Sequence, residues 1–168
     1  IIPAPKAIPE KKFEDFFKIS EEEWINFAKV ISNNIKIFND NGFSLGYHNH
    51  SFEFNVLPNG KFPIEYILDE NENLKFEIDL GWTMAGNANP IEWINKYRNQ
   101  IIACHLKDFY SDKNMLIHDN QSSIGEGFIN WKELLREISE TPCEVIAIEH
   151  DDPKDYKKYI LKSLEFLS

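Results

Sequence analysis

Four short apolar segments of the chain each end on a side chain that can bind a metal ion. The segments span residues 43–47, 75–78, 101–104 and 145–148, and the residues that follow them are His48, Asp79, His105 and Glu149. Polar groups at the carboxyl ends of parallel strands meet at one edge of a sheet or barrel, so we expect these side chains to converge. Imidazole and carboxylate ligands together suit Mn²⁺, Co²⁺, Zn²⁺ or Fe²⁺ better than Ca²⁺. The pattern therefore predicts a divalent metal site.

Helix signals separate these four segments. Ser20 and Glu23 form a capping box before apolar residues that recur at helical spacing as far as Phe38. Further helices are expected at 63–68, 90–97, 130–138 and 152–167. Residues 1–9 are interpreted as the end of a strand followed by a Pro-rich loop. Strict alternation of helices and strands predicts a parallel α/β sheet with crossover helices.

Length and charge limit the classes of protein that fit. The 168 residues suit a single domain, which we assign to 1–168. A net charge of −10 argues against binding to nucleic acid or to an anionic membrane surface. No apolar stretch approaches the roughly 20 residues that a membrane-spanning helix needs. We therefore expect a small-molecule substrate, no nucleic acid and no membrane.

Five sequence motifs, taken together and in order, resemble the sugar phosphate isomerase/epimerase family. The motifs lie at 46–54 (Gly-Tyr-His-Asn-His-Ser-Phe-Glu-Phe), 77–82, 105–108, 125–127 with Trp131, and 148–151. That family has a xylose isomerase-like TIM barrel and includes inosose dehydratase-like proteins. The resemblance implies an α/β fold of the TIM-barrel type, here its C-terminal half with four to five parallel strands and crossover helices.

The resemblance also implies a divalent metal, often Mn²⁺, held by a Glu, Asp, His, Glu set at the strand ends. Asp79, His105 and Glu149 match three of these four ligands. His48 stands where members of the family carry a glutamate, so either His48 or Glu53 is expected to be the fourth. We favour His48, because it closes the strand, whereas Glu53 must fold back from a loop.

The resemblance implies a metal-dependent isomerase or epimerase that acts on a sugar, sugar phosphate or keto-sugar through an enediolate. Glu149 is the expected base on one side of the substrate, and Glu53 or His50 is the expected group on the other. The expected substrate contacts are His50, Trp82, Lys107 and Glu126. Two alternatives stay open, namely a dehydratase of a keto-inositol or keto-sugar at the same metal site and a non-catalytic sugar-binding or assembly module.

Barrels of this type need roughly 250 residues, so the chain is expected to be the C-terminal part of a longer barrel whose substrate site it does not complete alone. A half barrel leaves two open sheet edges, which favour a homo-oligomer. We expect a cytoplasmic location, and a periplasmic or secreted one stays open because the resemblance places the start of the chain inside the barrel.

Overall fold

A computed structural model describes residues 1–3 and 13–168, and a four-stranded parallel sheet lies at its centre. The strands are β1 (Gly46–His48), β2 (Lys75–Asp79), β3 (Ile101–Leu106) and β6 (Val145–Ile148), and they lie side by side in that order. Ile2 adds a parallel bridge to Tyr47 on the outer side of β1, which confirms the predicted strand end at the start of the chain. The predicted loop that follows falls largely outside the described residues.

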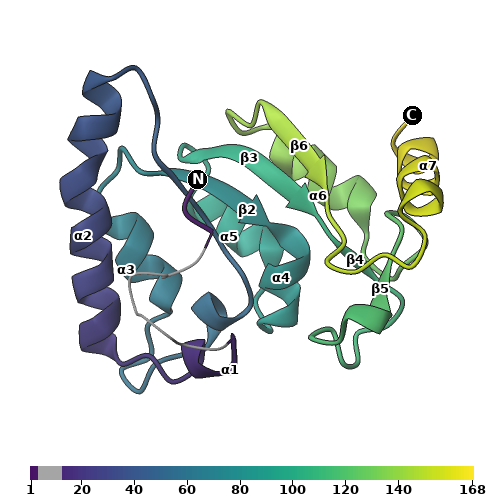
Figure 1. Cartoon of the computed structure of the whole chain (residues 1–168), viewed down its shortest axis with the longest axis horizontal. Coiled ribbons are helices and arrows are strands. Elements are labelled where there is room, and N and C mark those ends of the chain that lie inside the picture. Colours follow the sequence, from purple (N-terminus) through teal and green to yellow (C-terminus); the bar gives the residue numbers. More distant parts are fainter. Residues whose placement is uncertain (4–12) are drawn as a thin grey trace.

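Helices connect these strands in the predicted alternation (Figure 1). The helices of four or more residues are α1 (Phe13–Phe16), α2 (Glu21–Asp40), α3 (Pro63–Asp69), α4 (Leu80–Ala85), α5 (Pro90–Lys96), α6 (Trp131–Ser139) and α7 (Tyr156–Leu167). Two short 3-10 helices, η1 (Phe52–Phe54) and η2 (His118–Asn120), and a two-stranded hairpin of β4 (Asp108–Phe109) with β5 (Gln121–Ser122) complete the fold.

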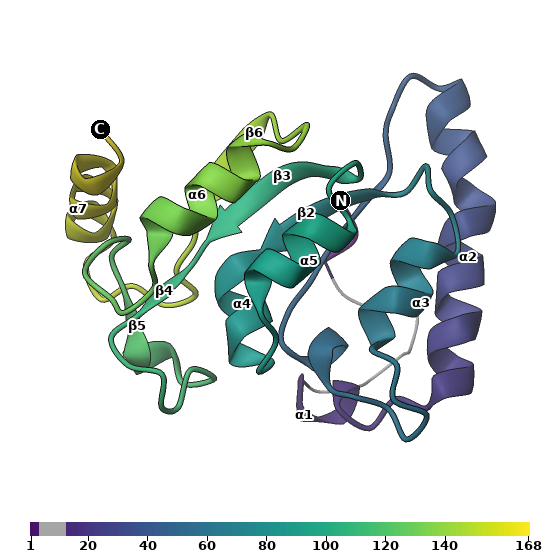
Figure 2. The same ribbon diagram turned by 180° about the vertical axis from the view of Figure 1, so that it is seen from behind.

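The two faces of the sheet differ in chemistry. Tyr47, Phe76, Ile78 and Cys104 are fully buried, as expected for the face that packs on helices. Figures 1 and 2 show α5 and α6 together on one side of the sheet. Side chains alternate along a strand, so His48, Asp79 and the other polar residues of these strands share the opposite face. The sheet therefore separates a hydrophobic core from a polar surface at the strand ends.

Two predicted element boundaries are wrong and one helix was not predicted, each for a local reason. The first strand begins at Gly46 rather than residue 43, because the Phe43 N–H still bonds to the Phe38 carbonyl at the end of α2. A helix, α4, follows directly after β2, because the Asp79 side chain caps it. The last helix begins at Tyr156, with Asp155 rather than residue 152 as its cap. The predicted capping box at Ser20 is confirmed.

Strand β6 lies at the edge of the sheet, and its side chains are unusually exposed for a parallel sheet. Val145 is 57% exposed and Ile146 is 50% exposed. The predicted association of copies through an open edge stays a prediction. No helix in the described part of the chain is long and apolar enough to cross a membrane.

Candidate metal centre

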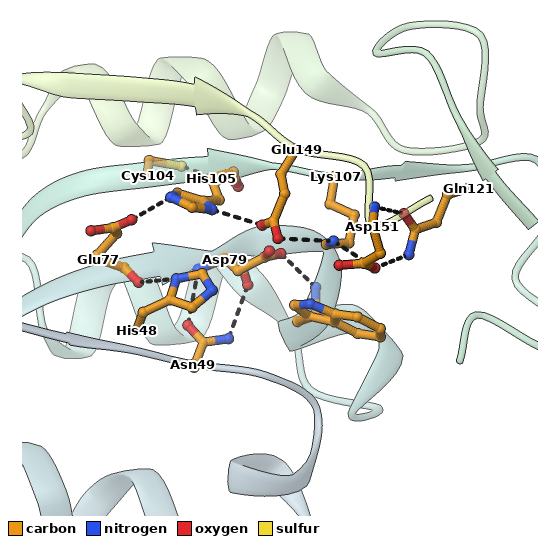
Figure 3. A network of polar contacts seen from close by, with 11 residues as sticks. His48, Asn49, Glu77, Asp79, Cys104, His105, Lys107, Gln121, Glu149 and Asp151 are labelled. Carbon is orange, nitrogen blue, oxygen red and sulfur yellow. Dashed lines mark hydrogen bonds and ion pairs between the residues drawn. The ribbon is translucent and has the colours of Figure 1, made fainter. Parts of the chain in front are cut away.

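The four side chains at the carboxyl ends of the central strands meet at one place, as the sequence predicts (Figure 3). His48, Asp79, His105 and Glu149 each offer one donor atom, and these atoms all lie within 4.8 Å of one another. The parallel register explains the meeting, because Asp79 pairs with His105 across β2 and β3, and both residues lie at the carboxyl ends of their strands. Glu53 is not a member of this group.

Asp79 combines a structural and a chemical role. Its Oδ1 accepts a hydrogen bond from the Trp82 N–H at 2.7 Å, and Asn49 bonds to both its backbone N–H (2.9 Å) and its backbone carbonyl (3.1 Å). Its Oδ2 is buried, and no donor among the described residues reaches it. Burial raises the pKa of Asp79 well above its ordinary value, and the positive charge of Lys107 opposes this only in part. A buried carboxylate oxygen without a donor fits a cation ligand.

His105 lies between two carboxylates. Its Nδ1 is 2.7 Å from Oε2 of Glu149, and its Nε2 contacts Oε1 of Glu77. Burial alone lowers the pKa of His105, but the hydrogen bond to Glu149 and the nearby negative charges raise it above its ordinary value. A carboxylate on the far nitrogen of a ligand histidine fixes the ring and makes it a better donor to a metal. Glu77 fits that supporting role.

His48 offers a neutral imidazole to the same group. Its Nδ1 is 3.2 Å from the Glu77 backbone carbonyl, which can only accept, so Nδ1 carries the proton and Nε2 keeps its lone pair. Burial, and then the neighbouring rings of His105 and His50, lower the pKa of His48 to about 3. A histidine that stays neutral across the physiological range can bind a metal without first losing a proton.

Glu149 is held ionised by its neighbours. Burial raises its pKa, but the His105 hydrogen bond and the Lys107 charge outweigh burial and lower the pKa well below its ordinary value. The Lys107 ammonium is fully buried, 3.4 Å from Oε1 of Glu149 and 2.9 Å from Oδ2 of Asp151. It also lies 4.8 Å from the centre of the Trp82 ring. The negative charge of Glu149 also raises the pKa of Asp79, and a divalent cation beside the two groups would favour the ionised form of both.

The other predicted substrate contacts divide into two groups. His50 lies beside the four side chains, with its ring centre 5.2 Å from that of His48 and 6.0 Å from that of Trp82. Lys107 and Trp82 also border the group. Glu126 does not, because its carboxylate pairs with Lys162 of α7 beside a cavity of about 430 Å³. The structure therefore places Glu126 away from the candidate metal centre.

Four residues of the site were missed by the sequence reasoning. They are Asn49, Glu77, Gln121 and Asp151, which hold Asp79, His105 and Lys107 in place. A signal existed for Glu77, because it stands two residues before Asp79 in the same strand, and residues two apart in a strand face the same way. Gln121 carries no such signal, since it comes from the β4–β5 hairpin.

Comparison with known proteins identifies the family of this chain. Residues 7–168 match the family model described as the xylose isomerase-like TIM barrel. An inosose dehydratase from Clostridium beijerinckii is 23% identical over 91% of this chain and 59% of its own length. An uncharacterized protein from Methanocaldococcus jannaschii is 29% identical over 82% of this chain and 50% of its own length.

Solved structures give the same fold. A sugar phosphate isomerase/epimerase from Parabacteroides distasonis superposes with a TM-score of 0.74 and 23% identity, covering 88% of this chain and 52% of that protein. The present chain thus spans about half the length of the curated relatives and solved structures that it matches.

Proposed function

The chain belongs to the xylose isomerase-like TIM barrel family, and we propose that it carries the metal centre of an isomerase or epimerase acting on a sugar, a sugar phosphate or a keto-sugar. One observation supports this proposal most strongly, namely the convergence of His48, Asp79, His105 and Glu149 within 4.8 Å. The set contains two imidazoles and two carboxylates, which suits Mn²⁺, Co²⁺, Zn²⁺ or Fe²⁺. We place Mn²⁺ first because the family resemblance implies it.

These four side chains would hold the cation, and the cation would supply Lewis-acid stabilisation to negative charge on substrate oxygens. Glu149 would accept the proton from the carbon beside the carbonyl, because its lowered pKa keeps it ionised at neutral pH. Lys107 is a fully buried cation next to Glu149, so its ammonium can donate a hydrogen bond to a substrate oxygen where charge develops.

An epimerisation also needs a second group, which returns or removes a proton on the opposite face of the substrate. His50 is our candidate, because its ring borders the metal centre and burial lowers its pKa, which leaves it neutral and able to accept a proton. The position of Glu53 does not support the expectation that it plays this part. Its two carboxyl oxygens accept hydrogen bonds from the Tyr47 hydroxyl and the His50 backbone N–H.

A dehydratase is the second candidate function. The similarity to inosose dehydratases from two Clostridium species favours it. Removal of a proton beside a carbonyl, followed by loss of a β-hydroxyl group, needs the same base and the same charge stabilisation. Isomerase, epimerase and dehydratase reactions therefore share their first step at this site.

That shared step can be measured directly. Purified protein would be incubated with Mn²⁺ in D₂O together with compounds on which related proteins act. These compounds are inosose, L-ribulose, D-allulose and a 3-keto-D-glucoside. NMR would then measure the incorporation of deuterium at carbon. We expect exchange with at least one compound, its loss with EDTA, and at least about a hundredfold slower exchange in Glu149→Gln. Equal exchange in Glu149→Gln, or exchange that persists undiminished with EDTA, would contradict the proposal.

A further inference from the structure

Glu53 has a fully buried carboxyl group with a partner on each oxygen. The Tyr47 hydroxyl donates to Oε1 at 2.6 Å, and the His50 backbone N–H donates to Oε2 at 2.8 Å. Glu53 belongs to η1, where Phe52 and Phe54 on either side of it are also buried. A buried carboxyl group is costly unless it is hydrogen-bonded, so these two contacts are strong constraints on the local backbone.

The segment that Glu53 fixes is the one that carries His50 to the metal centre. The His50 ring stacks on Phe52 at 5.5 Å with an angle of 7° between the planes, and it meets His48 edge-on at 5.2 Å. Thus Glu53 holds the backbone of His50, and the neighbouring Phe52 holds its ring. Both contacts come from η1, which lies directly after the turn at the end of β1.

The groups around Glu53 also separate it from the reaction. Its two hydrogen-bond partners are the Tyr47 hydroxyl and a backbone N–H, and Tyr47 points to the helix-covered face of the sheet, where its ring meets Phe27 at 6.0 Å. Burial raises the pKa of Glu53 to about 8, against the opposing effect of these hydrogen bonds, so the group is mostly protonated at neutral pH. A neutral acid that is bound on both oxygens is suited to fixing structure.

We propose that Glu53 is a positioning residue, which ties the Tyr47 side chain to the His50 backbone and so fixes His50 at the edge of the metal centre. The importance of His50 for turnover rests on the proposed function, whereas the positioning contact can be tested without it. Glutamine can reproduce both contacts, because its carbonyl oxygen accepts from the His50 N–H and its amide group donates to the Tyr47 oxygen. Leucine has a similar size and can make neither contact.

The test compares Glu53→Gln and Glu53→Leu with the wild type, and uses Glu72→Gln, at an exposed position, as the matched control. The first measurement is hydrogen exchange of the His50 amide by ¹⁵N NMR. We expect exchange at the wild-type rate in Glu53→Gln and in the control, and exchange about tenfold faster in Glu53→Leu. Mn²⁺ affinity should change less than about threefold in all variants, because Glu53 is not a ligand.

The second measurement is turnover with any compound that exchanges deuterium with the wild type. Positioning predicts that Glu53→Gln keeps kcat within about threefold, while Glu53→Leu lowers kcat at least about tenfold with KM little changed. Loss of turnover in Glu53→Gln with a protected His50 amide would make Glu53 a base and overturn the proposal. An unchanged His50 amide in Glu53→Leu would overturn it as well.

Two further outcomes are also decisive. When the wild type shows no turnover, the His50 amide alone decides the positioning role. When Glu53→Leu does not fold, Tyr47→Phe takes its place, since it removes one of the two anchors. We then expect His50 amide exchange about threefold faster than in the wild type, and an unchanged rate would overturn the proposal.

Discussion

The imidazole of His105 has a carboxylate at each nitrogen, Glu149 at Nδ1 and Glu77 at Nε2. A cation bound by the four side chains would compete with a proton for Nδ1 of His105, the nitrogen that faces Glu149. The Glu77 contact would remain, keep the proton on Nε2 and point the lone pair of Nδ1 toward the other ligands. At the scale of single residues, Glu77 therefore orients His105 and strengthens it as a ligand.

Replacing Glu77 with glutamine should weaken Mn²⁺ binding by about tenfold, because the imidazole loses a charged partner but keeps its place. The measurement is a Mn²⁺ titration followed by water-proton relaxation. Glu72→Gln, an exposed glutamate of the loop before β2, is the matched control and should bind as the wild type does. Equal affinity of Glu77→Gln and the wild type would show that Glu77 does not support His105.

Glu53 should make stability depend on pH. Its pKa is raised to about 8 in the folded protein from 4.5, so the folded state binds more protons than the unfolded state between these values. The Glu53 contribution is therefore fully present below about pH 4.5 and is lost as the pH rises toward 8, by roughly 1 kcal/mol for each pH unit.

The comparison of wild type with Glu53→Gln isolates this contribution, since glutamine does not titrate. Urea unfolding at pH 5.5 and pH 7.5 should show the wild type losing stability relative to Glu53→Gln as the pH rises. The pH changes of all other groups cancel in this difference. A difference in unfolding free energy that is the same at both pH values would contradict a buried, protonated Glu53.

At the scale of elements, the junction between β2 and α4 connects the metal centre to the fold. Asp79 ends the strand and caps the helix, so the helix begins without a loop. Gly81 makes this possible because it has no side chain. A Cβ atom at this position would lie 2.2 Å from the backbone carbonyl oxygen of Lys107, the residue that follows β3. The first turn of α4 thus packs directly on the chain that carries Lys107.

Gly81→Ala should destabilise the protein by about 1–3 kcal/mol, because a backbone carbonyl cannot move aside as a flexible side chain can. Urea unfolding measures the loss, and Ala85→Ser at the half-buried end of the same helix is the control, with a change below about 1 kcal/mol. Mn²⁺ affinity should also fall in Gly81→Ala, since the shift displaces Asp79. Wild-type stability in Gly81→Ala would mean that the two segments are not packed this closely.

The sequence could predict the alternation of elements and the residues at the strand ends, since both follow from hydrophobic pattern and parallel strand geometry. It could not predict α4, because the Asp79 residue that signals a strand end also caps a helix. It could not place Glu53, because its burial depends on how η1 folds back on Tyr47. It could not predict the surroundings of Glu126 either, since its partner Lys162 comes from α7, 36 residues later.

At the scale of the whole molecule, the parallel order of β1, β2, β3 and β6 brings distant parts of the sequence to one centre (Figure 3). His48 and Glu149 are about a hundred residues apart in the chain, yet their donor atoms lie within 4.8 Å. All four proposed ligands thus come from this chain, although it spans about half the length of its relatives. Metal binding by the chain itself is therefore the central claim.

Elemental analysis of the metal-loaded protein tests that claim most directly. After equilibration with Mn²⁺ and removal of excess metal, the wild type should retain one Mn²⁺ per chain, and Asp152→Asn, an exposed neighbour of the site, should retain the same amount. Asp79→Asn should retain less than about a tenth, although asparagine can still cap α4 and preserve the fold. A wild type that retains no metal, or an Asp79→Asn protein that retains as much as the wild type, would contradict the metal centre described here.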